Sequence, residues 1–215
     1  MKMFILFFLS LPFFCMANIK TLDVDIIDYD AFAAKTPEAI EQLQTALLKR
    51  GLVGIRGVPG YKEKAANYIN ALRSFSSLPM ETKKKYSPDG MTEKAKHFLG
   101  FNDGGEKFRL PNGQWVVDDQ KYSIYSIYPD MCENRWPEEL DLKTPFEEIC
   151  AIVTDVGKTI LEDIELISPK TGMTRDSLAP HVCRQLHYSK SGNTETNNPY
   201  WCGAHFDHGL FTGLL

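Results

Sequence analysis

Two side chains near the end of the chain have the chemical types and the spacing that metal binding requires. His205 and Asp207 lie two residues apart in a run rich in aromatic and aliphatic residues, 201–215. Such a run predicts a β-strand, on which residues i and i+2 point to the same face. An imidazole and a carboxylate would then converge, and they are two of the three ligands in the 2-His-1-carboxylate set of non-haem Fe(II) sites. Alone, a His-x-Asp pair is a weak signal, because most such pairs lie on protein surfaces without a metal.

The surrounding residues strengthen this signal. Residues 203–215 (GAHFDHGLFTGLL) resemble the iron motif of the isopenicillin N synthase-like, 2-oxoglutarate-dependent dioxygenases. Residues 184–188 (RQLHY) resemble the strand that precedes that motif in the family. Two further landmarks are similar to family segments: 78–83 (LPMETK), a helix start, and 134–137 (NRWP), which precedes a long helix.

The resemblance implies an α+β fold in which helices near the N-terminus support a double-stranded β-helix, or jelly roll. It implies that His205 and Asp207 bind Fe(II), and that 2-oxoglutarate is the co-substrate, although some relatives use ascorbate instead. Tyr188 matches a family position that contacts the co-substrate carboxylate; the alternative is a core tyrosine whose hydroxyl is hydrogen-bonded. The expected reaction uses dioxygen to oxidise a small organic molecule by hydroxylation, desaturation or ring closure.

The family's second metal-binding His and its Arg-x-Ser co-substrate clamp match no residue before the chain ends at Leu215. The resemblance therefore implies C-terminal truncation and an incomplete jelly-roll sheet. We expect an N-terminal dioxygenase region over 18–175 and the start of the Fe(II)/2-oxoglutarate domain over 176–215. The alternative function is an inactive, truncated remnant without catalysis. The chain as it stands, with two of the three ligands, is expected to bind iron poorly and to show no turnover.

Composition and charge limit the kinds of partner that the protein is expected to bind. The 215 residues carry a net charge of −4 and 43% are hydrophobic, enough for a core. Because the protein is acidic, with a pI near 5.8, we expect no nucleic-acid partner. The lysines at 83–85 are interpreted as a solvated helix face.

The first residues differ in composition from the rest. Lys2 precedes an apolar run, 3–14, and Cys15-Met16-Ala17 offers small residues for a signal peptidase. This layout predicts a signal peptide over 1–17, export to the periplasm or the exterior, and no stable membrane anchor after cleavage. The alternatives are a misassigned start or a buried N-terminal segment in a cytoplasmic protein.

Four cysteines follow the predicted cleavage site: Cys132, Cys150, Cys183 and Cys202. In a cytosolic protein they would be small core residues, whereas export would permit disulfides. For an exported chain we predict a Cys183–Cys202 bond, because both residues lie on adjacent strand candidates. This pairing depends on the register, because a slip of one residue would turn one side chain to the other face.

Hydrophobic periodicity predicts the remaining elements. Strands are expected at 19–29, at 52–58 and at 181–188, the first at the edge of the main sheet. A helix over 37–50, capped by Thr36, is expected to bury Ile40, Leu43, Leu47 and Leu48. A second helix, 62–75, should bury Ala65, Ile69, Leu72 and Phe75. A long helix should begin at a capping box, Thr144 to Glu147. Its apolar residues recur at helical spacing and should form one buried stripe along its length: Phe146, Ile149, Cys150, Val153, Val156, Ile160 and Ile164. Asn112-Gly113 predicts a hairpin turn.

Other aromatic and imidazole side chains have structural interpretations. Residues 87–135 are the least regular part of the chain and contain five aromatic residues of interest: Phe98, Phe101, Tyr122, Tyr125 and Tyr128. These side chains could line a substrate pocket, but packing between helix and sheet is the favoured interpretation. His187 is expected to point away from Tyr188, and His208 away from Asp207. His97 and His181 are interpreted as structural or exposed.

Overall fold

The computed structural model describes residues 23–88, 99–104, 106–118, 121–130, 134–188, 207 and 209–215. The predicted signal peptide, 1–17, lies outside these residues. No described helix combines the length and the apolar character that crossing a membrane would require.

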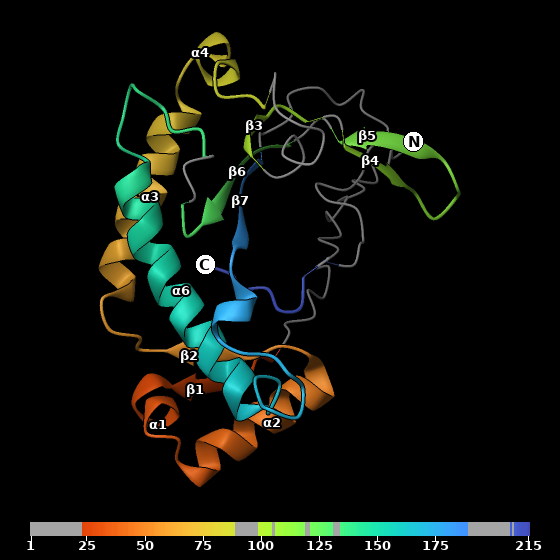
Figure 1. Cartoon of the computed structure of the whole chain (residues 1–215). Helices are drawn as coiled ribbons and strands as arrows, with labels where there is room; N and C mark the ends of the chain where they lie inside the picture. Colours follow the sequence, from red (N-terminus) through yellow and green to blue (C-terminus); the bar gives the residue numbers. More distant parts are fainter. Residues whose placement is uncertain are drawn as a thin grey trace, which may run out of the picture.

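Helices and strands are mixed along the described chain without regular alternation (Figure 1). The helices are α1 (Tyr29–Ala33), α2 (Pro37–Arg50), α3 (Tyr61–Ser76), α4 (Met80–Lys84), α6 (Lys143–Asp163) and the 3-10 turn η1 (Asp176–Leu178). The strands are β1 (Ile26–Asp28), β2 (Gly54–Arg56), β3 (Gly100–Asn102), β4 (Glu106–Arg109), β5 (Trp115–Asp118), β6 (Lys121–Tyr128) and β7 (His181–Tyr188).

The strands form three small sheets. The largest, which we call the central sheet, is antiparallel with the order β3-β6-β7. Strands β4 and β5 form the hairpin predicted at Asn112-Gly113. Strand β1 pairs in parallel with β2. The prediction that the first strand lies at the edge of the main sheet is therefore wrong, because β1 bonds only to β2 within the described chain. The described strands do not by themselves show a double-stranded β-helix.

Helix α6 joins two hydrophobic cores. Its first half contributes Phe146 and Ile149 to a core shared with α3 and β6, and its second half contributes Ile160 to a core shared with α1 and α2. Figure 1 shows α3 and α6 side by side along the β3-β6-β7 sheet, with α1, α2, β1 and β2 gathered at one end. The apolar stripe predicted along this helix is confirmed at these three residues.

Helix α2 begins and ends where the sequence predicts, but on α2 and α3 some residues that were predicted to be buried are exposed. Thr36 caps α2 by accepting a hydrogen bond from the backbone N–H of Ala39, and Gly51 ends it in the left-handed conformation, φ +68°. Leu43 is buried as predicted, but Leu48 is 87% exposed. On α3 the predicted Ile69 is 40% exposed, and the neighbouring Tyr68 is buried instead.

The three lysines at 83–85 differ in their surroundings. Lys84 and Lys85 form exposed ion pairs, as a solvated helix face implies. Lys83 is buried, and its ammonium group donates to the backbone carbonyl of Ser76 and lies 4.5 Å from the centre of the Tyr122 ring. The solvated interpretation is therefore wrong for Lys83, which attaches α4 to the end of α3.

The N-terminus of α6 is capped by Asp141, which was not predicted from the sequence. The helix begins at Lys143, and the carboxylate of Asp141 accepts a hydrogen bond from the backbone N–H of Thr144 at 3.0 Å. This bond lowers the pKa of Asp141. The predicted capping box from Thr144 to Glu147 is therefore wrong, because Thr144 already lies inside the first turn.

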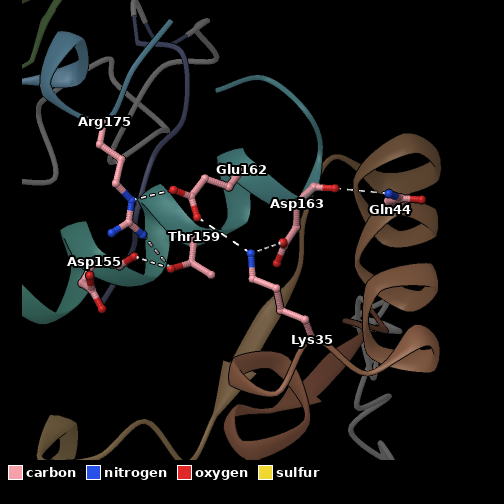
Figure 2. A network of polar contacts seen from close by, with 7 residues as sticks. All are labelled: Lys35, Gln44, Asp155, Thr159, Glu162, Asp163 and Arg175. Carbon is pink, nitrogen blue, oxygen red and sulfur yellow. Dashed lines mark hydrogen bonds and ion pairs between the residues drawn. The ribbon is translucent and has the colours of Figure 1, made fainter. Parts of the chain in front are cut away.

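Polar contacts near the C-terminus of α6 hold three segments together (Figure 2). Lys35, in the turn after α1, contacts Asp163 at 2.8 Å, and this contact raises the pKa of the lysine. Gln44 on α2 donates to the backbone carbonyl of Asp163. Arg175, just before η1, donates to Glu162 at 2.7 Å, so the segment leading into β7 is attached to the helix.

Phe146 is predicted to be the most sensitive position of this fold. Its side chain is 0% exposed and contacts the rings of Tyr68, Tyr128 and Trp136. Phe146→Ala should lower the free energy of unfolding in urea by about 3–5 kcal/mol, because the ring leaves a cavity. Leu48→Ala, a truncation on an exposed face, is the control and should change it by less than about 0.5 kcal/mol. Equal losses in both variants would contradict the packing described here.

Candidate active-site face of the central sheet

The register of β6 and β7 separates their side chains into two faces. Antiparallel pairing places Tyr122 opposite His187, Ser126 opposite Cys183 and Tyr128 opposite His181. These pairs face the helices: Tyr128 contacts Phe146, and the Tyr122 hydroxyl donates to the backbone carbonyl of Ser76 on α3. The alternate pairs must therefore point away from α3 and α6.

That second face, which we call the polar face, carries the polar residues Lys121, Ser123, Tyr125, Arg184 and Tyr188, together with the apolar Ile127, Val182 and Leu186. Lys121 is only 5% exposed and Ser123 only 3%. Arg184 donates to the Ser123 hydroxyl at 3.0 Å, and its guanidinium group lies 4.9 Å from the centre of the Tyr125 ring. Two cations, a hydroxyl and two phenols thus share one side of the sheet, an arrangement suited to an anionic ligand.

Tyr188 lies at the end of β7, opposite Lys121, and is half-buried on the polar face. His187 lies on the other face and stacks on Tyr122 with ring centroids 4.6 Å apart, which confirms that it points away from Tyr188. From the sequence, Arg184 was predicted only as part of the 184–188 motif, and Lys121 and Ser123 were not predicted to belong to the site. Side chains alternate between the two faces of β6 and β7, and this alternation is the signal that places these residues on the same face as Tyr188.

The aromatic residues of the irregular region divide between the two faces. Phe101, Tyr122 and Tyr128 pack in or against the helix-facing core, so the packing interpretation is confirmed for them. Tyr125 lies on the polar face instead, beneath Arg184. Phe98 and His97 lie outside the described residues.

Of the two predicted metal ligands, the structure describes Asp207, while His205 lies outside the described residues, as does His208. Asp207 is exposed, and its Oδ2 accepts a hydrogen bond from the Thr212 hydroxyl at 2.7 Å. Neither Asp207 nor 209–215 forms a strand, so the strand prediction is wrong for this part of 201–215. Within the described ranges no three His, Cys, Asp or Glu side chains gather as a metal site.

Cys183 has a different neighbour from the predicted one. Cys202 and Cys132 lie outside the described residues, whereas Cys183 is a free thiol whose sulfur lies 3.6 Å from that of Cys150 on α6. Cys183 is free, so the described residues do not show the predicted Cys183–Cys202 disulfide, whose second cysteine lies outside them. The side of β7 that carries Cys183 faces the long helix α6.

His181 begins β7 beside a pocket whose lining includes Lys158 and Asp155 of α6 and Arg175 and Asp176 near η1. The Nε2 atom of His181 is buried and has no hydrogen-bond partner among the described residues. Burial lowers the pKa of His181, and the charge of Lys158 lowers it further. The neutral imidazole is therefore the form that the folded protein favours.

This preference predicts a loss of stability in mild acid. The unfolded chain binds a proton on His181 near its ordinary pKa of 6.5, whereas the folded protein binds it only at lower pH. The free energy of unfolding should therefore fall as the pH decreases below about 6.5 and level off below the folded-state pKa. Urea unfolding of wild type and His181→Gln from about pH 8 to about pH 5 measures this, and the variant should lose less. A steeper loss in the variant would contradict the assignment.

The fold matches a class of known structures. The chain covers 57% of a 2OG-Fe(II) oxygenase family protein from Caulobacter crescentus, with a TM-score of 0.58, 20% sequence identity and 78% of this chain aligned. A full-length Neurospora crassa protein in complex with alpha-KG gives a TM-score of 0.56 at 17% identity, over 80% of this chain and 56% of that chain. JOX2 in complex with 2OG, Fe and JA gives 0.56 at 14% identity, over 78% of this chain and 48% of that chain. The described part therefore shares its fold with part of the 2OG-Fe(II) oxygenases.

Sequence comparison points to particular relatives. The chain is 29% identical over 190 residues to homoarginine-6-hydroxylase 2-ODD-C23.1 of Arabidopsis thaliana, covering 81% of this chain and 56% of the relative. It is 27% identical over 194 residues to homoarginine-6-hydroxylase 2-ODD-C23 of Glycine max, covering 82% and 57%. No family model matches the chain. The resemblance to Fe(II)/2-oxoglutarate-dependent dioxygenases is confirmed, and the chain spans just over half the length of these curated relatives.

Proposed function

We propose that the protein is an Fe(II)- and 2-oxoglutarate-dependent oxygenase that hydroxylates a small organic molecule. His205 and Asp207 would bind the metal, and Tyr188 would contact the co-substrate. The observation that carries the proposal is the polar face, where Lys121, Arg184 and Tyr188 lie on the strands that precede the His-x-Asp pair. By extension, we propose that the β3-β6-β7 sheet belongs to a jelly roll.

The chemistry of the donors fits the metal. An imidazole and a carboxylate are ligands that suit Fe(II), and bound iron would supply the oxidation, with 2-oxoglutarate and dioxygen as co-substrates. The Thr212 hydroxyl bonded to Asp207 is a partner of the kind that orients a ligating carboxylate. We assign only these two ligands, because the sequence resemblance matches no further one.

The polar face suits the dicarboxylate co-substrate. Lys121 and Arg184 place positive charge on this face, and carboxylate recognition by a guanidinium or ammonium group is a charge-assisted interaction. Arg184 is held by Ser123 and by the Tyr125 ring, so its guanidinium group is fixed before a ligand arrives. A pre-positioned cation loses less conformational entropy on binding than a mobile one.

Iron binding tests the metal ligands. Protein purified without air from its native host should bind Fe(II), and the His205→Ala and Asp207→Ala variants should lose that binding, because each removes one donor. The matched control is His187→Ala, which removes an imidazole stacked on the opposite face and should keep iron binding. Anaerobic titration measures all four proteins. Unchanged iron affinity in both ligand variants would refute the assignment, and absence of binding in wild type would favour the inactive alternative.

Co-substrate binding tests Tyr188. Tyr188→Phe should weaken 2-oxoglutarate binding roughly tenfold, the effect of losing one hydrogen bond to a charged group, while iron binding stays unchanged. Tyr122→Phe is the matched control, since its hydroxyl donates to the backbone of Ser76 on the helix side. Calorimetric titration of the iron-loaded protein with 2-oxoglutarate measures both. Equal effects in the two variants would show that Tyr188 is a structural residue.

The relatives suggest the first substrate to test. Both curated relatives are named homoarginine-6-hydroxylases, so homoarginine should be incubated with the iron-loaded protein, 2-oxoglutarate and dioxygen. Hydroxylation would add one atom of dioxygen to the substrate, while the other enters succinate as 2-oxoglutarate loses carbon dioxide; mass spectrometry measures the hydroxylated substrate and succinate.

A further inference from the structure

Two thiols from distant parts of the chain meet between α6 and β7. The sulfur atoms of Cys150 and Cys183 lie 3.6 Å apart, and both cysteines are free. Both are half-buried and pack against the core formed around Phe146 and Ile124. A disulfide has its sulfurs about 2.05 Å apart, so the observed separation must close by roughly 1.5 Å.

The surroundings favour reaction between these two thiols. Hydrogen bonding from Cys150 lowers the pKa of Cys183 and raises that of Cys150, so Cys183 is the sulfur that more readily becomes a thiolate. The thiolate is the nucleophile in thiol–disulfide exchange, and a neighbouring thiol resolves the intermediate. Because neither residue is sealed in the core, a small oxidant can reach the pair.

We propose that Cys150 and Cys183 are a redox-sensitive pair that forms a disulfide and thereby ties α6 to β7. The oxidant class is a low-molecular-weight disulfide. Cys183 thiolate attacks one sulfur of this oxidant, breaks its S–S bond and releases one small thiol, leaving a mixed disulfide. Cys150 then loses its proton and attacks the Cys183 sulfur, releasing the second small thiol. The two protein thiols lose two electrons, the oxidant gains them, and the protons end on the two released thiols.

The cross-link would act on the strand that carries the polar face. Cys183 is adjacent to Arg184 on β7, and the loop that the bond closes contains the C-terminal half of α6, Arg175 and η1. Closing this loop restricts the unfolded chain and fixes β7 against the helix. This inference is independent of the proposed oxygenase activity, since its test measures covalent linkage and thermal stability alone.

Peptide mapping tests the pairing in the full chain. The reduced protein is equilibrated with increasing ratios of oxidised to reduced glutathione, its free thiols are blocked with iodoacetamide, and it is digested with trypsin. Cys150 falls in peptide 144–158, Cys183 in 176–184, Cys202 in 191–215 and Cys132 in 122–135, so each pairing gives a distinct mass. The expected product joins 144–158 to 176–184.

Variants and melting temperatures complete the test. Cys150→Ser and Cys183→Ser should abolish the linked peptide, whereas Cys132→Ser and Cys202→Ser, the matched controls, should retain it. Oxidation should raise the melting temperature of wild type by about 5–10 °C, and that of Cys150→Ser not at all. A link between 176–184 and 191–215, or alkylation of both Cys150 and Cys183 at the most oxidising ratio in wild type, would overturn the proposal.

Discussion

Burial of one stripe of α6 is the constraint on which the rest of the structure depends. The same helix contributes Phe146 and Ile149 to one core and Ile160 to the other, so the two cores cannot separate without exposing its apolar face. Burial of each such side chain stabilises the fold by about 1.5–3 kcal/mol, whereas the exposed ion pairs around the helix contribute much less. The position of the central sheet follows from this helix.

Packing against α6 and α3 determines which side of the sheet can bind a ligand. Because side chains alternate along a strand, the residues of β6 and β7 that touch the helices leave their neighbours on the opposite side. Tyr128 and Cys183 pack toward α6, and Arg184 and Tyr188 are consequently on the other face. The polar face thus results from the same register that builds the core, and a shift by one residue would exchange the two.

Local sequence signals predicted the helices, strands and turns better than they predicted contacts between distant segments. The ends of α2 and the hairpin at Asn112-Gly113 depend on neighbouring residues, and both predictions are correct. Periodicity gave the correct stripe of α6, but on α2 it did not show that Leu48 is exposed. The partner of β1 and the neighbour of Cys183 depend on segments far away in the sequence, which no local pattern encodes. The iron ligands rested on resemblance, and of them the structure describes only Asp207.

Two contacts of different kinds attach the chain leading into β7 to helix α6. Arg175 bonds to Glu162 and to Thr159 (Figure 2). The Cys150–Cys183 contact lies further along the chain, at the strand itself. The ion pair is exposed and weakened by salt, so it restrains the segment only modestly. A covalent bond at the strand is insensitive to salt and depends instead on redox conditions. The register of β7, and with it the polar face, would therefore be secured by the thiol pair where the ion pair is insufficient.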